Sequence, residues 1–91
     1  RVLFRSGLVN EVAPLDQLDA AVTALVKPLL AGGPLAQKAA KDLIAAVNGR
    51  PIDAETLELT AQRIARQRST DEARDGVSAF LDKRPPAWMQ P

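Results

Sequence analysis

Apolar positions recur at intervals of three and four residues along most of this sequence, which is the spacing of one face of an α-helix. The first such stripe falls in residues 16–30, at Leu18, Ala21, Val22, Leu25, Val26 and Leu29. Asp16 and Asp19 near its start favour the positive end of the helix dipole. Pro28 lies in the last turn, where it predicts a kink or a frayed end. The pattern therefore predicts a helix over residues 16–30.

Two more helices are expected, each bounded by residues that start or stop a helix. After the break at Gly32 and Gly33, Pro34 suits the first position of a helix over residues 34–48. Its apolar face contains Leu35, Ala36, Ala39, Leu43, Ile44 and Val47. Gly49 follows as a stop. Asp53 is a good N-cap for a third helix ending near residue 68. Its narrow apolar stripe contains Leu57, Ala61, Ile64 and Ala65, and its solvated face is expected to contain Glu58, Gln62, Arg63 and Arg66.

A fourth helix is expected after residues 69–72 (STDE), which match a capping box in which the serine caps the backbone and the glutamate reaches back. Its apolar side contains Ala73, Val77, Phe80 and Leu81. It should end near residues 83–84, because two prolines follow. Trp88, in the tail, is expected to pack on a neighbouring surface. With a short extended lead over residues 7–13, the sequence predicts an all-α fold of about four helices around a small, shallow core.

The first six residues (RVLFRS) match the translated end of a widely used sequencing-adapter oligonucleotide. Val2, Leu3 and Phe4 also have the composition of a strand. We interpret residues 1–6 as an artefact and exclude them from the fold. On this interpretation residue 7 marks an accidental truncation, and residues 7–91 are one helical region with further sequence upstream.

Composition and charge narrow the possible partners. The 91 residues carry 12 basic and 11 acidic side chains, a net charge of +1, with no dominant basic cluster. Nucleic-acid binding is therefore not expected. No apolar run approaches the roughly 20 residues of a membrane span, so no membrane partner is expected. Cysteine is absent, which fits a reducing compartment, and we expect a cytoplasmic protein.

No complete catalytic site is found in the sequence. Histidine and cysteine are both absent, which excludes the Ser/His/Asp and Cys/His arrangements. No glycine-rich phosphate loop occurs. Asp53, Glu55, Asp71 and Glu72 lie at helix starts, where they are better explained as caps and first-turn residues than as general acids. We therefore predict no catalytic residue and no metal ligand in this chain.

One group of side chains suggests ligand binding. Phe80, Lys83 and Arg84 place a ring and two cations one turn apart near a helix end. Such a group could stack on a purine and pair with a phosphate. The alternative is that Phe80 belongs to the core and the cations favour the helix C-terminus.

The order of motifs resembles the C-terminal part of the enoyl-CoA hydratase/isomerase (crotonase) family. Residues 7–12 (GLVNEV) with Pro14 resemble the turn that opens that region, and residues 15–18 (LDQL) resemble its first helix. Residues 33–36 (GPLA), with Lys38 and Lys41, are similar to its next helix. Residues 69–84 (STDEARDGVSAFLDKR) resemble its closing motif almost position for position, although Asp75 stands where glutamate is commoner. Residues 84–88 (RPPAW) resemble methylglutaconyl-CoA hydratase-like members.

The resemblance implies a crotonase fold, with an N-terminal ββα spiral that holds the active site and a helical trimerisation region that corresponds to residues 7–91. Members act on acyl-CoA thioesters, and hydratases add water using two glutamates that would lie upstream. It also implies that Phe80 and Lys83 contact the CoA adenine and phosphate region, often that of a neighbouring subunit. The expected function is a fragment of an enoyl-CoA hydratase, a lyase that assembles as a trimer or hexamer. No cofactor is expected, because CoA is part of the substrate, and the fragment alone should be inactive.

Two alternatives remain open. The first is another enzyme of the same fold, such as a Δ-enoyl-CoA isomerase, a dehydratase or a decarboxylase, because these would share the same tail. The second is a freestanding helical interaction module without catalysis, which would fold alone in a cooperative, monomeric transition.

Overall fold

The computed structural model describes residues 5–89, and within this range the regular structure is entirely helical. Four α-helices and two short 3-10 helices follow one another as η1 Leu15–Gln17, α2 Leu18–Ala31, α3 Pro34–Val47, α4 Ala54–Arg68, α5 Asp71–Asp82 and η2 Ala87–Met89. The all-α prediction with four helices is confirmed. Residues 1–4, with the strand considered at 2–4, lie outside the described residues, and the interpretation of 1–6 as an artefact stays a prediction.

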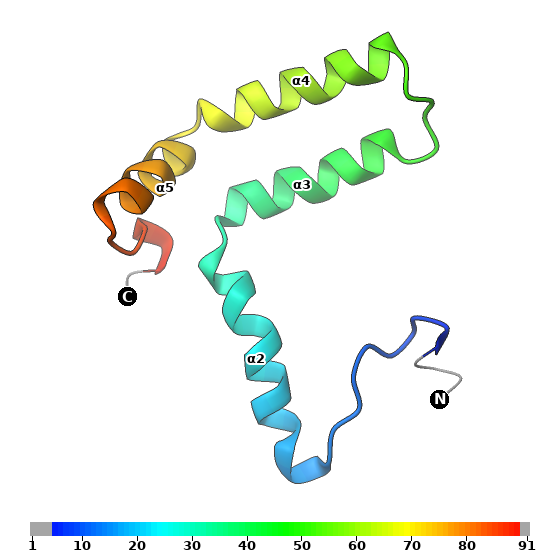
Figure 1. Ribbon diagram of the computed structural model, residues 1–91, viewed down its shortest axis with the longest axis vertical. Helices are drawn as coiled ribbons and strands as arrows, with labels where there is room; N and C mark the ends of the chain where they lie inside the picture. The colour runs from blue at the N-terminus through cyan, green and yellow to red at the C-terminus, as the bar shows by residue number, and fades with distance from the viewer. Residues whose placement is uncertain (1–4, 90–91) are drawn as a thin grey trace.

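The helices lie in a single layer (Figure 1). α3 and α4 run antiparallel, side by side, while α5 continues from the far end of α4 and returns toward the start of α3. α2, with η1, meets α3 at an angle of 95°. The principal extents are 46 × 39 × 16 Å, so the shortest dimension exceeds the diameter of one helix, about 10–12 Å, only slightly.

This layer encloses almost no core. The Cα radius of gyration is 17.6 Å, whereas a compact domain of this length would have about 12 Å. Among the described residues, Ala79 alone is buried. The expected shallow core is therefore wrong, because helices spread in one layer cannot surround a common interior. Their apolar stripes stay exposed.

α4 shows this most clearly. Leu57 and Ile64, from the predicted apolar stripe, are 60% and 59% exposed. Arg63, expected on the solvated face, is half-buried, as is Gln67, and both line an open groove beside α3. α4 therefore turns a mixed face toward α3, with Ile64 lining the same groove, while Leu57 and Ile64 stay largely exposed.

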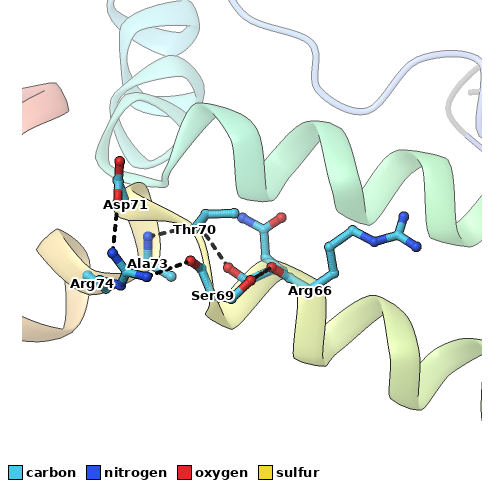
Figure 2. A network of polar contacts seen from close by, with 7 residues as sticks. Arg66, Ser69, Thr70, Asp71, Ala73 and Arg74 are labelled. Atoms are coloured by element: carbon cyan, nitrogen blue, oxygen red, sulfur yellow. Dashed lines mark hydrogen bonds and ion pairs between the residues drawn. The ribbon is translucent and has the colours of Figure 1, made fainter.

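The junction between α4 and α5 differs from the predicted capping box (Figure 2). Thr70 is the N-cap of α5, and its hydroxyl oxygen accepts a hydrogen bond from the Ala73 N–H at 3.1 Å. The Ser69 hydroxyl instead donates to the Arg66 carbonyl at 2.7 Å, which satisfies the end of α4. The cap is thus displaced by one residue, and Glu72 makes its contacts elsewhere.

In the part of the chain that the structure describes, no single helix has the length and apolar character needed to cross a membrane. η1 and α2 together with α3 meet those criteria only as a pair, and that pair is bent by 95°.

Candidate functional site

Glu72 joins α5 to the first turn of α3. Its two carboxylate oxygens accept hydrogen bonds from the backbone N–H groups of Leu35 and Ala36, each at 2.9 Å. These are first-turn N–H groups, which have no partner within their own helix. The carboxylate also lies at the positive end of the α3 dipole. A Cβ at Gly33 would displace the Glu72 carboxylate, so glycine at this position leaves room for the contact. The sequence had predicted only a local capping-box role for Glu72, so this long-range contact was not expected.

Trp88, in the C-terminal tail, supports the bend between α2 and α3. Its indole N–H donates to the carbonyl oxygen of Ala31, the last residue of α2, at 3.1 Å. Its ring lies against Gly76, where an added Cβ would come within 2.9 Å of the ring. The side-chain amide of Gln37 donates to the Leu29 carbonyl. The expectation that Trp88 packs on a neighbouring surface is confirmed, and the polar contacts fix the bend between α2 and α3.

Asp75 attaches the tail to α5. One carboxylate oxygen accepts from the backbone N–H of Ala87 at 2.7 Å, and the other accepts from the Arg84 guanidinium at 3.1 Å. The hydrogen bond from Ala87 lowers the pKa of Asp75 below its ordinary value; partial burial opposes this shift, and Arg84 adds to it. Asp75 was recognised from sequence only as a departure from glutamate, and its role depends on a chain reversal that the two prolines do not specify.

The C-terminal end of α5 forms a Schellman motif around Lys83. The Arg84 N–H donates to the Ala79 carbonyl at 3.0 Å, and the Lys83 N–H donates to the Phe80 carbonyl at 3.3 Å. Lys83 has φ +55° and ψ +42°, the left-handed conformation that glycine usually supplies at this position. Among the described residues it is the one non-glycine with positive φ. The backbone here is therefore held in a conformation that costs energy for lysine.

The structure places the predicted ligand-binding pair together at this helix end. Phe80 is 82% exposed, so the alternative that its ring belongs to the chain's own core is wrong for the described residues. Lys83 is also exposed, and within residues 5–89 no ion pair engages its ammonium group. Arg84, the second predicted cation, differs: it is paired with Asp75 and lies 3.7 Å from an Asp82 oxygen. A phosphate contact from this group would thus come from Lys83.

Two further carboxylates, those of Asp53 and Asp42, stabilise helices. Asp53 caps α4 as predicted, because its side chain accepts from the Thr56 N–H at 2.9 Å, and this bond lowers the pKa of Asp53. Asp42 pairs with Lys38 one turn away at 2.9 Å, which lowers the pKa of Asp42. Over residues 5–89 no group of three or more acidic, cysteine or histidine side chains could hold a metal ion.

Comparison with known proteins identifies the family and the fold. The sequence model of the family described as enoyl-CoA hydratase/isomerase matches residues 3–91. A Thermus thermophilus protein provisionally named an enoyl-CoA hydratase is 31% identical over 82 residues, which are 90% of this chain and 32% of that protein. A Legionella pneumophila crystal structure, provisionally described as an enoyl-CoA hydratase/isomerase (crotonase), superposes with a TM-score of 0.85 at 32% identity. The match covers 94% of this chain and 33% of that one.

The chain thus spans about a third of the length of the relatives it matches. The superposition confirms that its helices form the helical region of the crotonase fold. Together with the family match over nearly the whole length, this shows that the chain belongs to the enoyl-CoA hydratase/isomerase family.

Proposed function

We propose that this chain is the C-terminal helical region of an enoyl-CoA hydratase, and that its own contribution is to bind the CoA part of the substrate and to join subunits. The parent enzyme adds water to a 2-enoyl-CoA thioester. Its catalytic groups belong to the two thirds of the relatives' length that the chain does not span. No cofactor is proposed, because CoA arrives with the substrate, and the proposed location is the cytoplasm.

The observation that carries the CoA proposal is the exposed pair at the end of α5. The Phe80 ring offers an uncovered aromatic face, which is suited to stacking on adenine. Lys83 follows one turn later, and no carboxylate within residues 5–89 neutralises its ammonium group. A phosphate such as the CoA 3′-phosphate would form an ion pair with it. Neither residue touches the acyl group, so both should bind substrate and transition state equally.

The test is steady-state hydration of crotonyl-CoA by the full-length enzyme. Lys83→Ala should raise KM about tenfold, since a charge-assisted hydrogen bond is lost, and should leave kcat unchanged because uniform binding is removed. Lys27→Ala, which removes an exposed lysine from α2, is the matched control and should change neither constant. A large fall in kcat at constant KM would contradict the assigned role.

Phe80 can be tested separately. Phe80→Leu removes the aromatic face and should raise KM. Phe80→Tyr keeps the aromatic face and should leave KM unchanged. Equal effects of the two substitutions would indicate a packing role for this side chain instead. The 91-residue chain alone should not hydrate crotonyl-CoA, and activity from it would refute the placement of the catalytic groups elsewhere.

The subunit-joining role is supported by the uncovered apolar stripes. Large apolar side chains are exposed along every helix, among them Leu29, Leu57, Ile64 and Leu81. Exposed apolar side chains that recur at helical spacing mark faces that are covered by another part of a protein or by a second subunit. Sedimentation of the full-length enzyme should give a trimer or a hexamer, and a monomer would refute this part of the proposal.

An isomerase acting on a Δ-enoyl-CoA is the second candidate, because the matching family includes both activities by name. Assays with a 3-enoyl-CoA and a 2-enoyl-CoA distinguish the two. The ending of residues 84–88 makes methylglutaconyl-CoA a further substrate to include. A freestanding helical module is disfavoured by the open layer with Ala79 as its one buried residue among those described, and would require a cooperative, monomeric transition of the isolated chain.

A further inference from the structure

Arg84 lies beside the proposed phosphate-binding lysine, yet its side chain is turned away from that role. Its guanidinium donates to the Asp75 carboxylate at 3.1 Å, nine residues earlier on α5. The two side chains are only partly exposed, 38% for Arg84 and 29% for Asp75. Such a pair is better ordered than a fully solvated one, because fewer water molecules compete for it.

The same carboxylate also holds the chain beyond Arg84. Its second oxygen accepts from the Ala87 N–H at 2.7 Å, so one side chain fixes both the residue after Lys83 and the start of η2. The helix fixes the residues before Lys83. Lys83 is therefore held between two anchored segments, and the Schellman bonds on either side keep it at φ +55°.

This arrangement matters because a lysine does not adopt that conformation without support. In the left-handed region the Cβ of an L-residue comes too close to the following carbonyl oxygen, so without an anchor the backbone at Lys83 would sample other conformations. Each alternative would send the side chain in a different direction from the helix end. Strained backbone that the surrounding structure maintains is a known feature of binding sites.

We propose that Asp75 is a positioning residue for CoA binding: by holding Arg84 and Ala87, it keeps Lys83 in the conformation that presents its ammonium to the CoA phosphate beside Phe80. It also keeps the Arg84 guanidinium away from that phosphate. This inference rests on the proposed role of Lys83 in CoA binding. Asp75 itself touches neither substrate nor reacting atoms.

The experiment compares CoA esters with dephospho-CoA esters, which lack the 3′-phosphate, in the full-length enzyme. The readout is the ratio of KM values for the two substrates. Lys83→Ala should remove most of the preference for the CoA ester, a loss of about tenfold. Asp75→Asn keeps the side-chain volume and an acceptor for Ala87 but removes the charge that holds Arg84, and should reduce the preference by about threefold. The kcat of both variants should be unchanged.

Three further variants separate positioning from general damage. Asp75→Glu restores the carboxylate and should recover most of the preference. Asp71→Asn removes the same charge from the same helix at a 98% exposed position and should have no effect. In the Lys83→Ala background, Asp75→Asn should cause no further loss of preference, because the two residues act through one contact.

The outcomes distinguish the two proposals. If Lys83→Ala leaves the preference intact, the CoA role of Lys83 fails and the present inference fails with it. If Lys83→Ala abolishes the preference while Asp75→Asn retains it in full, the CoA role stands and the positioning role of Asp75 is overturned. A fall in preference on Asp75→Asn that is equal in the wild-type and Lys83→Ala backgrounds would also overturn it.

Discussion

The contact between Glu72 and the start of α3 gives the sharpest prediction about how this region is held together. Glu72→Ala removes two hydrogen bonds of 2.9 Å from the N–H groups of Leu35 and Ala36. It also removes a negative charge from the positive end of a helix dipole. A helix N-cap contributes about 0.5–2 kcal/mol, and a dipole charge about 0.3–1 kcal/mol. Because Glu72 is half-buried, we expect a combined loss of about 2 kcal/mol.

Amide hydrogen exchange of the full-length enzyme measures this loss where it occurs. The N–H groups of Leu35 and Ala36 are the donors themselves, so their exchange reports the opening of the contact. A loss of about 2 kcal/mol corresponds to exchange that is about 30-fold faster. Glu58→Ala is the matched control: Glu58 accepts a side-chain hydrogen bond from Gln62 on the surface of α4, and its loss should leave α3 unchanged.

Gly33→Ala tests the same contact from the other side. Gly33 has φ −63° and ψ +127°, which alanine adopts readily, so its effect would come from displacing the Glu72 carboxylate. In the wild-type background Gly33→Ala should accelerate exchange at Leu35 and Ala36. In the Glu72→Ala background it should change exchange by less than about twofold, because neighbours that share a contact are not additive. Equal acceleration in both backgrounds, or normal exchange in Glu72→Ala, would refute the reasoning.

Three further predictions concern the tail and the end of α5. Trp88→Phe keeps an aromatic side chain, although a smaller one, and loses the hydrogen bond to the Ala31 carbonyl. It should destabilise the end of α2 by at least about 1 kcal/mol, seen as faster exchange there; unchanged exchange would argue against that bond. Lys83→Gly should stabilise the α5 terminus by about 0.5–1 kcal/mol while raising KM for CoA esters, whereas a lower stability would contradict the assigned left-handed strain. Because the pKa of Asp75 is lowered from 3.8, its stabilising effect is complete above that pH and is lost as the pH falls through the lowered pKa; this acid-dependent release of the tail, followed by exchange at Ala87, should be absent in Asp75→Asn.

Most of the helical boundaries could be predicted from the sequence, because the signals that set them are local. Pro34 starts α3 and Asp53 caps α4, as expected. The two prolines after residue 84 also predicted that Phe80 and Lys83 lie near a helix end. Each of these signals acts within about one turn of the helix, where the chain itself supplies both partners.

The contacts between helices could not be predicted in the same way. Glu72 has a favourable local partner in a capping box, and nothing in residues 69–72 indicates that its carboxylate binds a helix 36 and 37 residues earlier. Arg63 was predicted to face solvent because the polar side of an amphipathic helix is expected to be exposed. In the structure, the side of α4 that packs against α3 contains both polar and apolar residues, and Arg63 is among them. The predicted core was wrong for a related reason. Amphipathic spacing indicates that an apolar face is covered, but it does not indicate which surface covers it.

The hydrogen bond from Trp88 to Ala31 also has a consequence for the order of folding. It joins residues 57 positions apart, and closing a flexible loop of that length costs more than about 3 kcal/mol of chain entropy. One hydrogen bond, worth about 1 kcal/mol, cannot offset this cost. We therefore expect the α3–α4 hairpin and the turn into α5 to form first and to bring the tail close, after which the remaining loop is short. Closure of the tail should be the last step, so the contact between Trp88 and α2 reports that the whole region has reached its native arrangement.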